Sequence, residues 1–273
     1  NASCMVKPLT STTYTVEVFD GKCSITLPHT ITVNKIEDPQ ISGPAQICLG
    51  ESTTLEVTNV PNPYVSYQWS TGETTQAIVV SPDQVGMSTY TVTVTDANEC
   101  TAEATIDIVV KSLPVASVTQ NIPLLCEGNH TVTLTATGAG INGTYNWYED
   151  DLATVPIALG TDNIIFTDLL VNKKVYVVAV DKFGCQSEPK EYELVVTPKP
   201  TPTITSSVPS NVLCEGGTLQ LTASDPDPNV TFEWADGTKG AHFTVTAGGA
   251  YRVTATNQAG CSQDASINII DQP

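Results

Sequence analysis

The fold of this chain is decided by the stretch Thr89-Tyr90-Thr91-Val92-Thr93-Val94-Thr95-Asp96-Ala97-Asn98-Glu99-Cys100. Tyrosine and valine alternate with threonine along its first half, and a period of two is typical of a β-strand with one buried face. The polar residues that follow predict a tight turn ending at a cysteine. The stretch therefore predicts the first strand and the turn of an antiparallel hairpin.

The same signal recurs along the chain. Turns that end in a cysteine are also predicted at Asp20-Gly21-Lys22-Cys23, Phe183-Gly184-Cys185 and Ala259-Gly260-Cys261. Three copies share the same series of four residues, which we call the column. In it a cysteine is followed about twenty residues later by a tryptophan, then by a tyrosine and a second cysteine. The columns are Cys48, Trp69, Tyr90, Cys100, then Cys126, Trp147, Tyr176, Cys185, then Cys214, Trp234, Tyr251, Cys261. Only the interval from tryptophan to tyrosine varies strongly, so the sequence predicts one small β-domain that is repeated.

Proline-containing segments separate the copies and set the predicted boundaries. Residues 38–112, 113–198 and 199–273 are three complete repeats, and residues 1–37 match only the C-terminal half of a fourth. Two or three strands cannot bury a core alone, so residues 1–37 are expected to form an open remnant. The alternating prolines of Thr197-Pro198-Lys199-Pro200-Thr201-Pro202 favour a stiff, extended connection, so we expect an elongated rod.

Composition excludes several classes of function. The chain has 273 residues, and 29 Asp and Glu against 11 Lys and Arg give a net charge of −18, with Arg252 as the one arginine. A nucleic-acid partner is not expected, because phosphate binding depends on clustered Lys and Arg. No apolar stretch is long enough to span a bilayer. The N-terminus lacks the pattern of a signal peptide, so we expect a signal already removed or an internal piece of a longer protein.

Eight cysteines and no C-x-x-C arrangement predict disulfides rather than zinc, and hence an exported, extracellular protein. Two pairing schemes are open. We expect pairing within repeats, which joins Cys48 to Cys100, Cys126 to Cys185 and Cys214 to Cys261, with Cys4 bonded to Cys23. The alternative joins Cys48 to Cys185 and Cys126 to Cys261 and leaves Cys100 and Cys214 unpaired. Disulfide geometry, with Cα separations up to roughly 7 Å, decides between the two schemes.

The three tryptophans keep a fixed distance from the first cysteine, which predicts core positions packed near a cystine, as in immunoglobulin-type sandwiches. Tyr90, Tyr176 and Tyr251 are predicted to join them in the core. Aromatic side chains outside the repeated column are better candidates for binding a ligand, and these are Tyr64, Tyr148 and Phe243.

Several motifs of the chain resemble a known group of repeats. They are Trp-Ser-Thr-Gly-Glu-Thr-Thr at 69–75, the hairpin at 89–100, Leu-Cys-Glu-Gly at 125–128 and 213–216, and Trp147-Tyr148. In these motifs the chain is similar to the immunoglobulin-like and PKD-like repeats of large Bacteroidetes surface proteins, which include the adhesins of gliding bacteria. The resemblance implies tandem immunoglobulin-like sandwiches, type IX secretion, and a stalk or adhesin role. The partners it implies are secretion or motility machinery, or an extracellular surface or polysaccharide.

Motifs with chemical potential each have a structural explanation. The run Gly138-Ala139-Gly140-Ile141-Asn142-Gly143 matches G-x-G-x-x-G, but a predicted strand follows it where a dinucleotide site needs a helix, so we expect a loop. Asp225, Asp227 and Asn229 offer oxygen ligands for calcium, as do Glu149, Asp150 and Asp151, without EF-hand spacing. Solvated acidic loops are the simpler interpretation of both runs, so no cofactor is expected and calcium stays an alternative. The three histidines, His29, His130 and His242, lie in separate repeats, which does not favour zinc.

The sequence therefore predicts an all-β, non-enzymatic stalk or adhesive region. The main alternative is a carbohydrate-binding or spacer module of a secreted polysaccharide-degrading enzyme, which an aromatic groove in a single repeat would favour. A third hypothesis is eukaryotic cell-surface recognition, for which the sequons at Asn129, Asn142 and Asn229 would have to be glycosylated.

Overall fold

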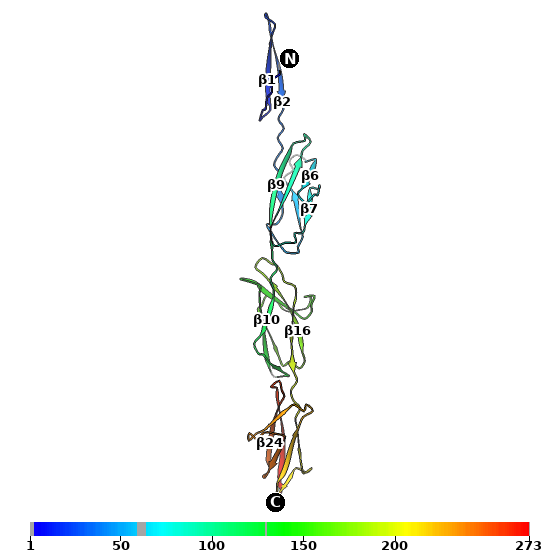
Figure 1. Ribbon diagram of the computed structural model, residues 1–273, viewed down its shortest axis with the longest axis vertical. Coiled ribbons are helices and arrows are strands. Elements are labelled where there is room, and N and C mark those ends of the chain that lie inside the picture. The colour runs from blue at the N-terminus through cyan, green and yellow to red at the C-terminus, as the bar shows by residue number, and fades with distance from the viewer. Residues whose placement is uncertain (1–2, 59–63, 129, 273) are drawn as a thin grey trace. The chain divides into compact units, whose positions relative to one another are not determined.

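The computed structural model describes residues 3–58, 64–128 and 130–272, and every regular element in these ranges is a β-strand (Figure 1). The chain divides into two compact units, Asn1–Leu113 and Pro114–Pro273. Among the described residues, no helix has the length and apolar character needed to cross a membrane. The predicted all-β class is confirmed.

The first unit holds a lone hairpin and one two-sheet sandwich. The hairpin pairs β1 (Thr12–Phe19) with β2 (Ser24–Ile31) in antiparallel register. One sheet of the sandwich contains β3 (Ile41–Ser42), β5 (Thr53–Val57) and β7 (Ala77–Val80) in that order. The other contains β4 (Gln46–Cys48), β9 (Thr101–Lys111), β8 (Gly86–Thr95) and β6 (Ser66–Trp69).

The second unit holds two further sandwiches built to the same plan. In residues 113–198 one sheet has β10 (Ser117–Gln120), β12 (Thr131–Thr137) and β15 (Asn163–Thr167). The other has β14 (Pro156–Ala158), β13 (Thr144–Tyr148), β16 (Lys173–Val180) and β17 (Lys190–Leu194), beside a short pair of β11 (Leu125–Cys126) and β18 (Val196–Thr197). In residues 199–273 the first sheet has β19 (Thr203–Ser206), β21 (Leu219–Ser224) and β23 (His242–Val245). The second has β20 (Val212–Cys214), β25 (Ser262–Gln272), β24 (Gly249–Thr256) and β22 (Thr231–Trp234).

Each sandwich is built around its tryptophan. Trp69, Trp147 and Trp234 lie on the equivalent strands β6, β13 and β22 and are at most 2% exposed. Each indole N–H donates to a backbone carbonyl, with Nε1···O distances of 2.9 to 3.0 Å to Thr75, Thr161 and Gly240. The hydrogen bond satisfies the single polar atom of a large apolar side chain, so the whole indole can be buried.

The tyrosine column needs one correction. Tyr90 is buried, and Tyr251 packs against the core of its repeat and donates its hydroxyl to the carbonyl of Ala247 at 2.7 Å. Tyr176 instead lies between the buried Val175 and Val177 and donates its hydroxyl to a carboxylate on the solvent face. In a strand, a shift of one residue turns a side chain to the opposite face. The sequence signal for this shift was the distance from Tyr176 to Cys185, which is one residue shorter than the equivalent distance in the other two repeats.

The hairpin of β1 and β2 forms a two-stranded sheet of its own, and no strand of the described residues extends it. No residue of either strand is buried. Val16 and Val18 pair across the strands with Leu27 and Ile25, and all four are about half exposed or more. Their equivalents Val92 and Val94 in β8 are fully buried. The hairpin therefore has the apolar residues of a core-facing strand pair but leaves them exposed, as expected for residues 1–37. The exact domain boundaries stay a prediction.

The glycine-rich run lies in the loop between β12 and β13, as predicted, and no helix follows it. Gly138 has φ of +108°, and a Cβ there would lie 1.9 Å from the carbonyl oxygen of Val115. The amide of Ala139 donates to the buried hydroxyl of Tyr145 at 2.9 Å. The glycines allow this close backbone approach and form no phosphate cradle at a helix N-terminus.

We expect Gly138→Ala to destabilise the second repeat by roughly 3 kcal/mol, since it combines a left-handed backbone with overpacking against Val115. Gly140→Ala is the matched control, because Gly140 also has a positive φ, of +78°, but a Cβ there meets nothing within 4 Å. It should cost about 1–2 kcal/mol. Urea unfolding of both variants measures the difference, and equal losses would show that the clash is relieved by movement of the loop.

Candidate functional site at the junction of the second and third repeats

The first cysteine of each repeat lies at the far end of the last strand of that repeat. A short strand carries it and pairs in parallel with that last strand, so that Cys126 lies opposite Thr197 and Cys214 opposite Gln272. Cys48 lies opposite Lys111 in the same way. The amide of the next residue extends each ladder, at 2.8 to 3.1 Å, to the carbonyl of Lys111, Thr197 or Gln272.

The second cysteine ends a turn that is closed by an acidic or amide side chain. In this turn Oδ1 of Asp96, Asp181 or Asn257 accepts the amide of Cys100, Cys185 or Cys261, each at 2.9 Å. Asp20 makes the same contact with Cys23 at 2.8 Å in a turn shorter by one residue. The residue before each cysteine of the longer turns has a positive φ, 90° and 95° at Gly184 and Gly260 and 62° at Glu99, the variant without glycine. All four cysteines are therefore presented by similar hairpin tips.

These two positions make a disulfide within a repeat impossible. Cys261 precedes the first residue of β25 and Cys214 lies opposite its last residue. At roughly 3.3 Å per residue, the 11 residues of β25 hold the two cysteines about 36 Å apart. A disulfide requires Cα atoms within about 7 Å. The expected pairing within repeats is wrong for this geometric reason.

The structure instead joins two repeats. Cys126 of the second repeat is bonded to Cys261 of the third, with a Cα–Cα distance of 5.6 Å and a sequence separation of 135. Cys4, Cys23, Cys100 and Cys214 are free thiols, which corrects the expected bond between Cys4 and Cys23 as well. Cys48 and Cys185 are both disulfide-bonded cysteines. The bond between Cys126 and Cys261 was part of the alternative pairing scheme.

Hydrogen bonds hold the proline-rich segment at this junction from both sides. On the second repeat, the carbonyl of Thr197 accepts the amide of Glu127 at 2.9 Å. On the third, Nδ2 of Asn257 donates to the carbonyl of Pro198 at 3.0 Å, and Asp225 Oδ2 accepts the amide of Thr201 at 2.6 Å. Asn257 therefore both closes the cysteine turn and binds the linker. An open cavity of about 750 Å³ beside the linker is lined by residues that include Glu127, Leu170, Lys199, Pro200, Pro202 and Asp264.

The acidic runs considered for calcium accept hydrogen bonds within their own turns. Besides Thr201, Asp225 accepts the amide of Asp227, and Asp227 accepts the amide of Asn229 at 3.0 Å. Asp150 accepts the amides of Thr154 and Val155. The hydroxyl of Thr154 and these amides lower the pKa of Asp150. No group of three or more metal-ligating side chains occurs in the described part of the chain.

Three aromatic side chains form a cluster in the third repeat. In the third repeat, Phe243 stacks on Trp234 with ring centroids 5.0 Å apart and lies 5.6 Å from Tyr251. A shallow pocket of about 290 Å³ at this cluster is lined also by Asp236 and Arg252. Of the other two candidate aromatics, Tyr64 is buried and donates its hydroxyl to the carbonyl of Glu37 at 3.0 Å, and burial raises its pKa. Tyr148 is half-buried on β13 opposite Tyr176.

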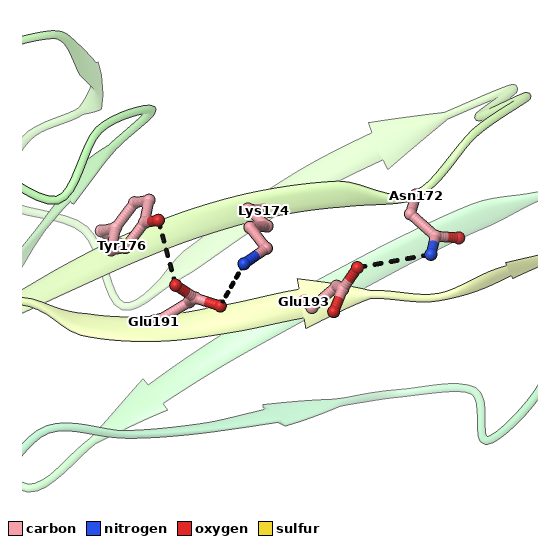
Figure 2. A network of polar contacts seen from close by, with 5 residues as sticks. All are labelled: Asn172, Lys174, Tyr176, Glu191 and Glu193. Atoms are coloured by element: carbon pink, nitrogen blue, oxygen red, sulfur yellow. Dashed lines mark hydrogen bonds and ion pairs between the residues drawn. The ribbon is translucent and has the colours of Figure 1, made fainter.

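The outer face of β16 and β17 carries a polar network, which Figure 2 shows. Glu191 accepts from Lys174 Nζ at 2.8 Å and from the hydroxyl of Tyr176 at 3.0 Å. Nδ2 of Asn172 donates to Glu193 at 3.3 Å. The hydrogen bonds from Lys174 and Tyr176 lower the pKa of Glu191, and the bond to Glu191 raises the pKa of Lys174. All of these groups face solvent, so the network is part of the hydrated surface of the second repeat.

Replacing Lys174 with methionine should raise the pKa of Glu191 toward its ordinary value, because the hydrogen bond from Lys174 is the one that lowers this pKa most. A lowered pKa stabilises the folded state above the unfolded pKa, and the contribution is lost as the pH falls through the folded pKa. An NMR titration of the Glu191 carboxyl carbon measures the shift. Lys239→Met, which removes an ion pair of the third repeat, is the control and should leave Glu191 unchanged.

The comparison with protein families agrees with this fold. Residues 112–198 match a family model described as an Ig-like domain, CHU_C associated. No curated protein sequence matches the chain. Among solved structures, fibronectin(III)-like modules of Clostridium thermocellum CbhA are 15% identical, with a TM-score of 0.35 over 59% of this chain and 94% of that one.

Two further solved structures are similar at the same level. Three N-terminal domains of the bacteriophage RB49 outer capsid protein Hoc are 13% identical, with a TM-score of 0.33 over 85% of this chain and 94% of that one. Four N-terminal Ig domains of Dscam1 are 14% identical, with a TM-score of 0.24 over 96% of this chain and 80% of that one. The repeated two-sheet sandwiches and the family model identify the chain as an all-β tandem of immunoglobulin-like domains.

Proposed function

We propose that this chain is part of an extracellular stalk or spacer that transmits tension between a surface and more distant binding regions. The observation that supports this most directly is the disulfide between Cys126 and Cys261. It links the end of one repeat to the start of the next, where a spacer of independent domains would have only a linker.

The position of the bond determines the path of a pulling force. Tension that enters the second repeat upstream of Cys126 and leaves the third repeat downstream of Cys261 passes through the two sulfur atoms. The segment between the two cysteines, which are 135 apart in the sequence, is bypassed by this short path and carries no tension. The proline-rich linker and the parts of both hydrophobic cores that lie between the two cysteines are thus protected from extension for as long as the disulfide is intact.

Charge and redox state support an extracellular setting. A structural disulfide persists where the environment is oxidising, which favours export from the cytoplasm. The net charge of −18 keeps neighbouring copies of such a protein apart and soluble. Threonine-rich strand faces, such as the half-buried one of β8, offer hydrogen-bonding groups to water.

The finer proposal is that the parent protein is a large surface adhesin exported by a type IX route, with a role in gliding. The sequence motifs that resemble repetitive Bacteroidetes adhesins support it, as does the CHU_C-associated domain model over residues 112–198. The partners would then be secretion or motility machinery that grips the repeats, or an extracellular surface or polysaccharide. Many weak contacts along linked repeats would raise the effective concentration for such binding.

The direct test of the stalk is a bead assay under cyclic load. The chain, attached at both termini, should lengthen reversibly and return to the same length over many cycles while its disulfides are intact. Irreversible lengthening in the oxidised state would contradict the proposal, because a stalk that unfolds under its working load loses its spacing function.

The aromatic cluster of the third repeat supports a second candidate function, binding of a carbohydrate. Aromatic faces with a few polar groups beside them are typical of sugar sites, and Phe243, Tyr251, Asp236 and Arg252 provide both. Affinity electrophoresis through gels that contain soluble β-glucan, xylan or pectin tests it. Binding that Phe243→Ala abolishes and Tyr148→Ala preserves would establish this function, and unretarded migration in every gel would exclude it for these polymers.

A further inference from the structure

We propose that Cys214 is a docking cysteine that forms a disulfide with the hairpin tip of a further immunoglobulin-like repeat, as Cys126 does with Cys261. This proposal goes beyond the stalk function and does not depend on it. The junction between the second and third repeats has two halves, the strand that carries Cys126 and the hairpin tip that carries Cys261. The third repeat has a second copy of the first half, at Cys214, and this cysteine is a free thiol.

The local structures of Cys126 and Cys214 are equivalent. Both follow a leucine and precede Glu-Gly, and both lie on a short strand in parallel register with the end of the last strand of the repeat. The next residue donates its amide to Thr197 O at 2.9 Å in one case and to Gln272 O at 3.1 Å in the other. Leu125 and Leu213, which precede them, are both buried. The backbone thus presents the two thiols in the same way.

The difference between the two cysteines is what covers them. Cys126 is 8% exposed because the Cys261 hairpin lies against it, and Cys261 itself is 1% exposed. Cys214 is an exposed free thiol. It lines an open cavity of about 370 Å³ together with Glu215, Gly216, Ala247 and Asp271. The surface that holds a hairpin in the second repeat is therefore present and uncovered in the third.

The chemistry of the occupant follows from the internal example. The hairpin tip at Cys261 has an Asn or Asp side chain that fixes the cysteine amide and a residue of positive φ directly before the cysteine. Asn257 also binds the linker through its Nδ2 atom. The partner is thus a repeat of this kind that follows in register, with a cysteine at the tip of its hairpin. The tip at Cys100, with its Asp96 cap, is a free example of this half of the junction.

Formation of the bond requires a two-electron oxidant, and oxidised glutathione serves. The thiolate of one cysteine attacks glutathione disulfide and releases one glutathione thiolate. The second cysteine thiolate then attacks the protein sulfur of the mixed disulfide and releases the other. Two protein thiols are oxidised, one glutathione disulfide is reduced to two thiols, and the two thiol protons pass to the released glutathione.

The test is to extend the full chain by a second copy of residues 199–273 placed directly after Pro273. Gln272 lies opposite Cys214 as Thr197 lies opposite Cys126, and in the sequence a proline follows each of them, so the appended repeat begins at the equivalent position to the third repeat. In the appended copy, the cysteine that corresponds to Cys214 is replaced by serine. The original and extended chains are oxidised in a glutathione redox buffer, alkylated, digested with trypsin and analysed by mass spectrometry.

Alkylation of Cys214 should fall by at least about tenfold in the extended chain relative to the original. A peptide that links Cys214 to the appended hairpin cysteine should appear. That peptide is distinguishable from the one containing the original Cys261, because trypsin cuts after Arg252 and only the appended peptide ends at the chain terminus. In the control, the extended chain with Cys214→Ser, the appended hairpin cysteine should be fully alkylated.

Three outcomes would overturn the proposal. Cys214 of the extended chain could be alkylated as fully as in the original chain, although near-ultraviolet circular dichroism shows that the appended repeat is folded. It could bond to Cys23 or Cys100 of a second copy in both chains, which would make the partner another copy rather than a following repeat. If the appended third repeat does not fold, residues 113–198 are appended instead, and failure of their Cys185 hairpin to bond Cys214 also overturns the proposal.

Discussion

Replacing Trp147 with alanine should destabilise the second repeat by about 4 kcal/mol, the largest loss that we expect from a single side chain. The indole is fully buried at the centre of the core and donates Nε1–H to the carbonyl of Thr161 at 3.0 Å. The substitution removes that packing and leaves the carbonyl without its donor. Since small domains have stabilities of only about 5–15 kcal/mol, the loss should lower the melting temperature of this repeat by roughly 15–30 °C.

Hydrogen exchange measured by mass spectrometry localises the effect, because the repeats do not have to unfold together. Peptides from β13 and β16 should exchange faster in the variant, and peptides from β24 and β25 should change little. Trp147→Phe separates packing from hydrogen bonding and should cost less than the alanine variant. A loss below about 1 kcal/mol for Trp147→Ala would contradict the assignment of Trp147 as the centre of the core.

Tyr176→Ala is the matched control, since it also truncates an aromatic side chain of the second repeat. Tyr176 bonds Glu191 on the solvent face instead of filling the core. Its loss should change stability by about 0.5 kcal/mol or less. The contrast between Trp147 and Tyr176 tests directly the register that the structure assigns to β13 and β16.

Local patterns in the sequence were sufficient to predict the long alternating strands, such as β8, and the turns that end in a cysteine. Alternation in β8 defines which face is buried, and the residues from Asp96 to Glu99 define where the chain turns, both through interactions between near neighbours. The tryptophans followed from their constant spacing. Tyr176 shows the limit of such reasoning, because an offset of one residue is a small change in spacing but reverses the face of a strand.

The candidate site depended on distances that no local pattern contains. Cys126 and Cys261 are 135 residues apart in sequence and belong to different repeats. The parallel pairing of β20 with β25 places the two cysteines of one repeat at opposite ends of the sandwich, and such pairing has a weak sequence signal in strands of three residues. Two observations were available in the sequence, the nearly identical motifs around Cys126 and Cys214 and the proline-rich linker. They indicated that a junction exists but not which cysteines meet there.

Removal of the junction disulfide should change the mechanical response of the chain more than its stability. We expect the double variant Cys126→Ser/Cys261→Ser to fold, because the second and third repeats each have a core of their own. Under load, however, the segment between the two positions, which are 135 apart in the sequence, becomes extensible. At about 3.3–3.6 Å per residue, the extended length between handles on either side should increase by roughly 450–490 Å.

Single-molecule pulling measures this increase if the handles are placed close to the junction. One handle is attached at Val115, which is 79% exposed and lies shortly before β10, and the other at the C-terminus. Cys214→Ser is the control, because that thiol is free and exposed and its loss should leave the extended length unchanged. If the double variant and the parent extend to the same length, tension does not pass through the bond between Cys126 and Cys261. The structural basis for the stalk would then be lost, whatever the stability of the separate repeats.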